Sequence, residues 1–201
     1  METHIYLIRH GETRWNREKR VQGHHDEPLS PEGVEQAQRL AKHMKEWPLD
    51  AVYASDLSRA IQTAEMLGRD RGLEVKPCPE IRERFFGEWE GLPIEEVKRN
   101  HPDEWEEVWY RGGCYGVEKA EDAQRRMMTW LEELLERHRG QRVAVVSHGG
   151  SINAVLDKVS RGEHGPGRTR IRNTAVSHLL HHREEGWRVV TVNQDDHLQK
   201  V

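Results

Sequence analysis

The chain has 201 residues, of which 33% are charged, and its formal net charge is −4 at pH 7. This weakly acidic balance argues against non-specific binding to nucleic acid, and the lack of a long apolar stretch argues against insertion into a membrane. The two cysteines, Cys78 and Cys114, provide neither a disulfide framework nor a metal-binding spacing. The length predicts a single domain over residues 1–201, and the lack of a signal peptide or lipidation motif predicts a cytoplasmic protein.

The first predicted strand, residues 4–8, is a short apolar and β-branched run that ends abruptly in Arg9-His10-Gly11. Ligands of open α/β sheets bind at the carboxyl ends of the strands, and Gly11 allows a sharp turn that exposes main-chain amides there. Arg9 and His10 therefore predict an anion site in which the histidine attacks a phosphorus atom. The alternative is a surface loop that happens to hold one of 13 histidines.

Two helices are predicted on either side of the second strand. Ser30 supplies an N-cap, and the proline after it suits the first turn of a helix that runs to about Trp47. The second strand covers residues 51–54, and the next helix, over 56–71, carries Arg59 in its first turn. Helical crossovers favour parallel strands, so we expect Arg59 at the same edge of the sheet as the first loop. A surface arginine is the alternative.

The polar stretch from residue 17 to residue 27 contains His24, His25 and Asp26. Adjacent residues rarely chelate one ion well, and no second cluster supports them. We therefore predict a solvated loop and no metal site.

A third short strand, over residues 73–75, precedes a segment in which charges alternate with aromatic residues, over 81–91. A carboxylate held against aromatic walls can act as a general acid, and Glu83 is predicted to take this role. The other glutamates nearby are expected to be solvated: Glu80, Glu88 and Glu90.

Residues 84–116 are predicted to form a small helical insertion over the site, with short helices between 92 and 110. The helix over 118–139 has apolar residues at helical spacing, which is typical of a core helix rather than of a cofactor site.

The near-continuous apolar run 142–147 predicts a strand in the centre of a parallel sheet. It runs into His148 and Gly149, as the first strand runs into its own histidine and glycine, so the amides around Gly149 are expected at the same edge. The last two strands, 171–182 and 187–193, are expected at the border of the sheet.

These residues together support phosphoryl transfer. The forks of Arg9 and Arg59 bind phosphate oxygens, and a neutral His10 can attack phosphorus to form a phosphohistidine. His148 can donate to an equatorial oxygen, where charge collects in the transition state. Glu83 would protonate the leaving alkoxide and then deprotonate the attacking water. Because the cationic side chains neutralise the phosphate, we predict neither a metal nor another cofactor.

Four motifs, in the same order along the chain, resemble those of the histidine phosphatase superfamily, also called the phosphoglycerate-mutase-like family. Residues 7–16, Leu-Ile-Arg-His-Gly-Glu-Thr-Arg-Trp-Asn, resemble its signature. Residues 55–60, 83–91 and 146–150 resemble its second-arginine, proton-donor and second-histidine segments. The resemblance covers nearly the whole chain. It implies a three-layer α/β/α sandwich with a mostly parallel central sheet.

The resemblance also implies roles for individual residues. His10 would be the phosphorylated nucleophile and Glu83 the acid and base. The residues implied to hold phosphate, or to lie near it, are Arg9, Asn16, Gln22, Gly23, Arg59 and His148.

Within this family the sequence favours a phosphatase over a mutase. The mutases carry asparagine where this chain has Gly150, lysine at the position of Ile94, and a paired arginine where this chain offers only Arg111. We predict a metal-independent, acid-type phosphomonoester hydrolase that acts through a phosphohistidine on small phosphorylated metabolites. A 2,3-bisphosphoglycerate-dependent phosphoglycerate mutase and a non-catalytic phosphate-binding module are the alternatives. The only predicted partner is a small phosphorylated substrate, and the oligomeric state is left open, with a homodimer as one option.

Overall fold

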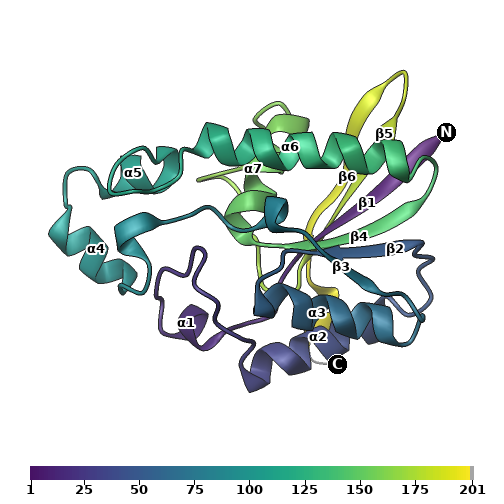
Figure 1. Ribbon diagram of the computed structural model, residues 1–201, viewed down its shortest axis with the longest axis horizontal. Coiled ribbons are helices and arrows are strands. Elements are labelled where there is room, and N and C mark those ends of the chain that lie inside the picture. The colour runs from purple at the N-terminus through teal and green to yellow at the C-terminus, as the bar shows by residue number, and fades with distance from the viewer. Residues whose placement is uncertain (200–201) are drawn as a thin grey trace.

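The computed structural model describes residues 1–199 as an α/β protein (Figure 1). Its strands are β1 (Glu2–Arg9), β2 (Ala51–Ala54), β3 (Val75–Pro77), β4 (Arg142–Ser147), β5 (Val176–His182) and β6 (Gly186–Gln194). Its α-helices are α1 (Arg14–Arg17), α2 (Pro31–His43), α3 (Ser58–Arg69), α4 (Ile94–Asn100), α5 (Trp105–Arg111), α6 (Ala120–Arg137) and α7 (Gly149–Val159). Three short 3₁₀ helices complete this part of the chain: η1 (Pro79–Ile81), η2 (Gly87–Trp89) and η3 (Asp196–Leu198).

The strands form one sheet in the order β3-β2-β4-β1-β5-β6. The first four strands pair in parallel, whereas β5 is antiparallel to both β1 and β6. Five of the six strands therefore point the same way, which confirms the mostly parallel sheet and the border position of the last two strands. Arg9 pairs with Ser147, so β1 and β4 end side by side at one edge.

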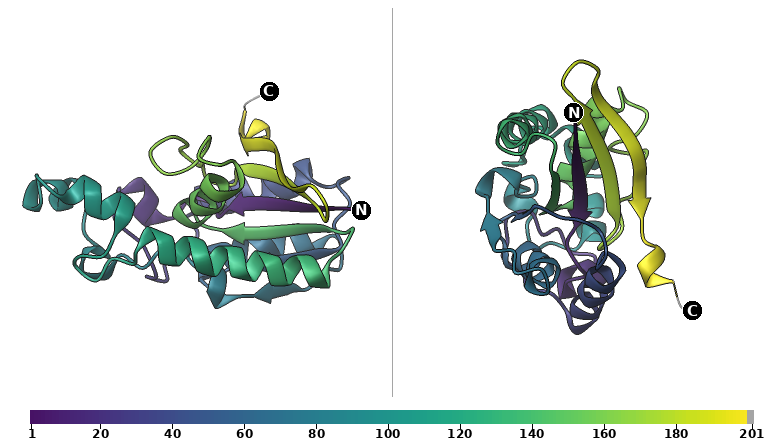
Figure 2. Two further views of the ribbon diagram at one scale, coloured as in Figure 1. Left: turned by 90° about the horizontal axis from the view of Figure 1, so that it is seen from above. Right: turned by 90° about the vertical axis from the view of Figure 1, so that its right-hand side faces the viewer.

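Helices cover both faces of this sheet, as Figure 2 shows. Side chains of a strand alternate between its two faces. Along β1, Ile5 and Leu7 join a core with α6 and α7, whereas Tyr6 and Ile8 join a second core with α2 and α3. The period-2 pattern of one buried strand thus fixes two helical layers, and the predicted three-layer α/β/α sandwich is confirmed.

A third, smaller core lies beyond the carboxyl end of the sheet. It joins Val21 of the first loop to residues of the predicted insertion, among them Phe86, Trp89 and Val108. Helices α4 and α5 project from the sheet on this side (Figure 1). The prediction of one domain over residues 1–201 includes residues 200 and 201, which lie outside the described part of the chain.

Three predicted elements have different bounds in the structure. The strand predicted over residues 171–182 begins only at Val176, because the chain first makes a turn in which the amide of Ala175 donates to the carbonyl of Arg172 at 3.1 Å. Helix α2 ends at His43 rather than near Trp47, because residues 44–47 form a turn ahead of Pro48, and a residue before proline disfavours helical geometry. The third strand begins at Val75, because the chain first closes α3 with a turn in which the amide of Leu73 donates to the carbonyl of Gly68. Between residues 1 and 199, no helix combines the length and the apolar character that a membrane crossing requires.

Candidate active site

The two histidine-glycine turns lie next to each other at the carboxyl edge of the sheet. The amide of His10 donates to the carbonyl of Ser147 at 3.1 Å, and the rings of His10 and His148 are 5.1 Å apart between centroids. His10 is 3% exposed and His148 is fully buried. The register of β1 and β4 therefore places two imidazoles side by side, from positions 138 residues apart in the sequence.

His10 is held in one tautomer by its own turn. Its Nδ1 lies 2.6 Å from the carbonyl oxygen of Gly11, which can only accept a hydrogen bond. Nδ1 therefore carries the proton, and Nε2 keeps its lone pair. Burial, followed by the charges of Arg59 and Arg9, lowers the pKa of His10 well below 6.5, so the ring is neutral at neutral pH.

The imidazole of His148 is fully buried and makes no hydrogen bond with the described protein. Both of its ring nitrogens are buried without a hydrogen-bond partner among the described residues. Burial and the charge of Arg59 lower its pKa well below 6.5. A neutral imidazole in this place keeps one N–H that no protein group accepts, which is a donor available to a ligand.

Two arginines flank these rings, Arg59 buried and Arg9 half-buried. The guanidinium of Arg59 donates to the carbonyls of His25 at 2.6 Å and Gly23 at 2.8 Å, and that of Arg9 donates to the carbonyl of Ile171 at 2.6 Å. The Nε atoms of both arginines are buried without a partner in the described chain. Burial lowers the pKa of Arg59 to about 10, so it remains charged at neutral pH. Buried cations held only by carbonyls are costly unless an anion binds beside them.

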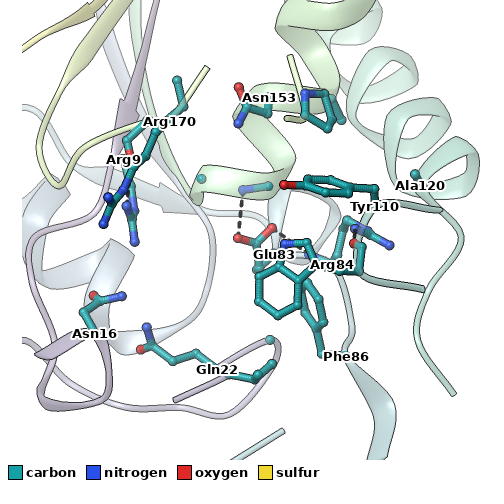
Figure 3. A pocket seen from close by; sticks show the side chains of 18 of the residues that line it. Arg9, Asn16, Gln22, Glu83, Arg84, Phe86, Tyr110, Ala120, Asn153 and Arg170 are labelled. Carbon is teal, nitrogen blue, oxygen red and sulfur yellow. Dashed lines mark hydrogen bonds between the residues drawn. The ribbon is translucent and has the colours of Figure 1, made fainter. Parts of the chain in front are cut away.

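Two side-chain amides complete the polar wall of the site. The main-chain amide of Thr13 donates to Oδ1 of Asn16 at 3.0 Å, and its hydroxyl donates to Oε1 of Gln22 at 2.7 Å. Because their oxygens are occupied, both amides keep their NH₂ groups for the pocket (Figure 3). These donors suit the oxygens of a phosphate.

Glu83 is the acidic group of the site, and main-chain amides hold it. Its carboxylate accepts from the amides of Gly150 and Ser151, each at 3.0 Å, and from that of Arg84 at 2.9 Å (Figure 3). The first two amides belong to the first turn of α7, where the helix dipole favours a negative charge. These three N–H donors fix the position of the carboxylate, and Phe86, Trp109 and Tyr110 line the same pocket.

The segment that carries Glu83 is clamped from α6. Arg126 donates to the carbonyls of Glu80 at 2.8 Å, Arg82 at 2.9 Å and Glu83 at 3.0 Å. Glu118 binds the same guanidinium with both carboxylate oxygens, at 2.8 and 3.0 Å. One arginine thus fixes three carbonyls of an otherwise irregular segment.

The sequence and the fold both have known relatives. Over residues 5–195 the sequence matches the histidine phosphatase superfamily (branch 1). The chain belongs to the histidine phosphatase superfamily. The uncharacterized phosphatase PhoE of Bacillus subtilis is 32% identical over 197 residues, which cover 98% of this chain and 97% of PhoE. Such relatives support phosphatase activity for this histidine phosphatase.

Relatives with other names occur as well. The probable phosphoglycerate mutase GpmB of Escherichia fergusonii is 31% identical over 207 residues, covering 96% of this chain and 94% of GpmB. Among solved structures, Bacillus stearothermophilus YhfR has a TM-score of 0.89 and 28% identity, covering 98% of this chain and all of that one.

In this histidine phosphatase, a pocket of about 530 Å³ opens at the site. Of the predicted site residues, only His148 does not line it, because that residue is fully buried next to His10. The predicted residues that line the pocket are Arg9, His10, Asn16, Gln22, Gly23, Arg59, Glu83 and Gly149.

The prediction of a solvated loop and solvated glutamates was wrong for some residues. A ring nitrogen of His24, Nε2, bonds the carbonyl of Glu83 at 2.8 Å. Glu90 accepts from the amides of His24 at 2.8 Å and Phe86 at 3.1 Å, and Asp26 accepts from Ser58. The first loop and the acid segment pack together, so their polar groups pair with each other rather than with water.

Several pocket residues were not predicted from the sequence. The pocket is also lined by Arg84, Tyr110, Asn153 and Arg170, which come from the segment 84–116, from α7 and from the loop after it (Figure 3). The loop between α7 and β5 has no periodic pattern that would have placed Arg170 there. Among residues 1–199, no three His, Cys, Asp or Glu side chains gather as a metal site would require.

Proposed function

We propose that this protein is a metal-independent, acid-type phosphomonoester hydrolase that acts through a phosphohistidine on small phosphorylated metabolites. The observation that carries the proposal is the state of His10. Its Nδ1 is committed to the carbonyl of Gly11, which leaves the Nε2 lone pair for the pocket. An imidazole in this tautomer is a competent nucleophile towards phosphorus.

In the first step, the phosphate oxygens lie against the guanidinium groups of Arg9 and Arg59 and the N–H of His148. Nε2 of His10 attacks phosphorus as the bond to the leaving oxygen breaks, so an N–P bond replaces an O–P bond. The carboxyl group of Glu83 gives a proton to the leaving alkoxide. The fixed cations stabilise the charge on the equatorial oxygens without reorganising.

In the second step, water replaces the departed alcohol. The carboxylate of Glu83 takes a proton from this water as its oxygen attacks phosphorus and the N–P bond breaks. Inorganic phosphate leaves, and both His10 and Glu83 return to their starting states. The lowered pKa of His10 keeps the nucleophile neutral below pH 6.5, which supports activity in mild acid.

One observation favours the hydrolase over the mutase. A Cβ at Gly150, where the mutases carry asparagine, would lie 2.6 Å from Oε1 of Glu83 and 3.1 Å from its Cδ. An asparagine at position 150 would therefore displace the carboxylate of Glu83 from its place at the start of α7.

The test measures phosphate release from p-nitrophenyl phosphate and 3-phosphoglycerate in EDTA, with 2-phosphoglycerate followed in a reaction primed with 2,3-bisphosphoglycerate. We expect hydrolysis without isomerisation, and a loss of at least about 10³-fold in His10→Ala. Quenched wild type should carry an acid-labile, alkali-stable phosphate that His10→Ala lacks. His182→Ala, at the opposite end of β5 from the site, is the matched control.

Each other outcome overturns a part of the proposal. Hydrolysis by His10→Ala near the wild-type rate would refute the nucleophile, and isomerisation would assign the protein to the mutases. A requirement for an added divalent ion would refute the metal-independent mechanism. Phosphate binding without turnover on any ester would favour the non-catalytic module.

A further inference from the structure

The pocket holds more positive charge than one phosphate group requires. Its lining includes six arginines and, among the described residues, a single acidic side chain, Glu83. Two of the arginines have carboxylate partners: Arg20 with Glu18 at 2.7 Å, and Arg168 with Asp157 at 3.6 Å. Four arginines have no ion-pair partner within residues 1–199: Arg9, Arg59, Arg84 and Arg170. A phosphomonoester brings at most two negative charges, so positive charge remains when it is bound.

Arg170 differs from the other three arginines in this set. Arg9, Arg59 and Arg84 each donate to one or two main-chain carbonyls, which fix their guanidinium groups. The guanidinium of Arg170 makes neither a hydrogen bond nor an ion pair with any described residue, although it lines the pocket. Its donors are therefore all available to a ligand.

The main chain around Arg170 is nevertheless fixed. The side-chain amide of Asn153 donates to the carbonyl of Thr169 at 2.7 Å, and that of Asn193 donates to the carbonyl of Arg170 at 2.9 Å. The guanidinium of Arg9 donates to the next carbonyl, that of Ile171, at 2.6 Å. Three successive carbonyls are thus held by three different elements. A free side chain on a fixed backbone loses less entropy on binding than one on a mobile loop.

Arg170 also lies close to the phosphate-binding arginine of β1. Figure 3 shows Arg9 and Arg170 on the same side of the pocket, with Arg84 and Tyr110 on the other side. The charge of Arg170 contributes to the lowered pKa of Arg9, so the two cations repel each other. Holding two cations together is unfavourable until anions bind beside both of them.

We propose that Arg170 binds a second oxyanion of the substrate, so that the preferred substrate is a small phosphomonoester that also carries a carboxylate or another phosphate near the first. The proposal rests on the hydrolase activity proposed above and adds the class of substrate. The phosphate to be removed binds at Arg9 and Arg59, and the second anion binds at Arg170, on the side of the pocket formed by the loop after α7.

Binding of two matched pairs of ligands tests this assignment. 3-Phosphoglycerate and sn-glycerol 3-phosphate differ by a carboxylate, and propane-1,3-diol bisphosphate and 3-hydroxypropyl phosphate differ by a phosphate. Dissociation constants are measured by calorimetry in His10→Ala, so that no ligand is consumed. We expect the member of one pair that carries the second anion to bind about tenfold or more tightly. Adding Arg170→Gln should abolish this preference.

Arg172→Gln is the control for the loss of a positive charge in the same loop. Arg172 pairs with Asp195 at 2.6 Å and does not line the pocket, so its substitution should leave the ratio of the two dissociation constants unchanged. A preference within the first pair identifies a carboxylate, and one within the second pair identifies a phosphate.

The assignment fails if neither pair shows a preference, or if the preference survives Arg170→Gln. Hydrolysis of p-nitrophenyl phosphate by wild type is measured alongside, because this ester has no second anion. An Arg170-dependent preference without such hydrolysis would overturn the proposed reaction and leave the second anion site standing. Hydrolysis of p-nitrophenyl phosphate without any preference between paired ligands would overturn the second anion site and leave the proposed reaction standing.

Discussion

The chain twice runs from a buried parallel strand into a histidine followed by a glycine, and the two turns differ in what surrounds the imidazole. After β1, the chain turns back, and the carbonyl of Gly11 accepts from Nδ1 of His10 at 2.6 Å. After β4, helix α7 begins at Gly149, directly beyond His148, and no described group forms a hydrogen bond with either ring nitrogen. The amides of the first turn of α7 bind Glu83 instead of the histidine.

This difference assigns different chemistry to similar sequences. A ring whose Nδ1 is tied to a carbonyl presents a fixed lone pair, which suits a nucleophile. A ring with two free nitrogens presents an N–H donor that can turn to a phosphate oxygen, which suits transition-state stabilisation. The acceptor next to the ring, rather than the histidine itself, separates the two roles.

Removal of the second histidine is the strongest test of the different roles assigned to the two rings. His148→Ala should lower kcat by about 10²- to 10³-fold, because one preorganised donor to the phosphoryl oxygens is lost. A phosphoenzyme should still form slowly in this variant and never in His10→Ala. Rapid-quench trapping of protein-bound phosphate measures both. A phosphoenzyme in His10→Ala and none in His148→Ala would show that the two roles are reversed.

The second turn also positions Glu83, so Glu83→Gln tests whether this residue protonates the leaving group. Glutamine cannot give a proton to an alkoxide, so hydrolysis of an alkyl phosphate should fall by at least about 10²-fold. p-Nitrophenyl phosphate should lose much less, because its leaving group needs little protonation. The ratio of the two kcat values for wild type and variant gives the answer, and equal losses would remove Glu83 from the role of acid.

The glycines that follow the two histidines, Gly11 and Gly149, predict a difference in the stability of alanine variants rather than in their catalytic rate. A Cβ on Gly11 would lie 2.6 Å from the carbonyl oxygen of Gly33, a main-chain atom that cannot move easily. A Cβ on Gly149 would have Arg9 as its nearest neighbour, at an ordinary 3.6 Å. We expect Gly11→Ala to lower the free energy of unfolding by about 1–3 kcal/mol and Gly149→Ala to lower it by less than about 1 kcal/mol. Urea denaturation compares them, and equal losses would contradict the steric reason.

Much of this fold follows from short-range patterns. The buried runs at residues 51–54 and 142–147 are strands with those bounds, because apolar side chains on both faces mark a central strand. The third strand was misplaced, since a three-residue border strand with one half-buried and two exposed side chains leaves little pattern to recognise.

The site residues likewise fall into two groups, those that could be predicted from short-range patterns and those that could not. Residues that follow strand ends, such as His10 and His148, could be placed together from the sequence because parallel strands share an edge. Arg126 could not, because its contacts with the acid segment span 43 to 46 positions and depend on how α6 packs. The same holds for Arg170, whose place depends on carbonyls held by α7, β1 and β6.

The smallest expected difference between the two turns lies in the pH dependence of stability. Burial lowers the pKa of His10 and His148 well below 6.5, whereas both titrate near 6.5 in the unfolded chain. As the pH falls below 6.5, the unfolded state takes up protons that the folded state does not, so the free energy of unfolding falls. This stability is fully present above pH 6.5, and its loss approaches the order of 1 kcal/mol per pH unit for each histidine.

Each alanine variant should therefore flatten the decline between about pH 7 and pH 5, measured by urea unfolding against wild type. The comparison with wild type is needed because other histidines with a lowered pKa, such as His178 and His197, contribute to the total slope. A protonated His10 would keep its bond to Gly11, which opposes the lowering of its pKa, whereas His148 has no such bond. His148→Ala should thus flatten the decline at least as much as His10→Ala. A wild-type slope in both variants would mean that the folded protein protonates these rings as readily as the unfolded chain does.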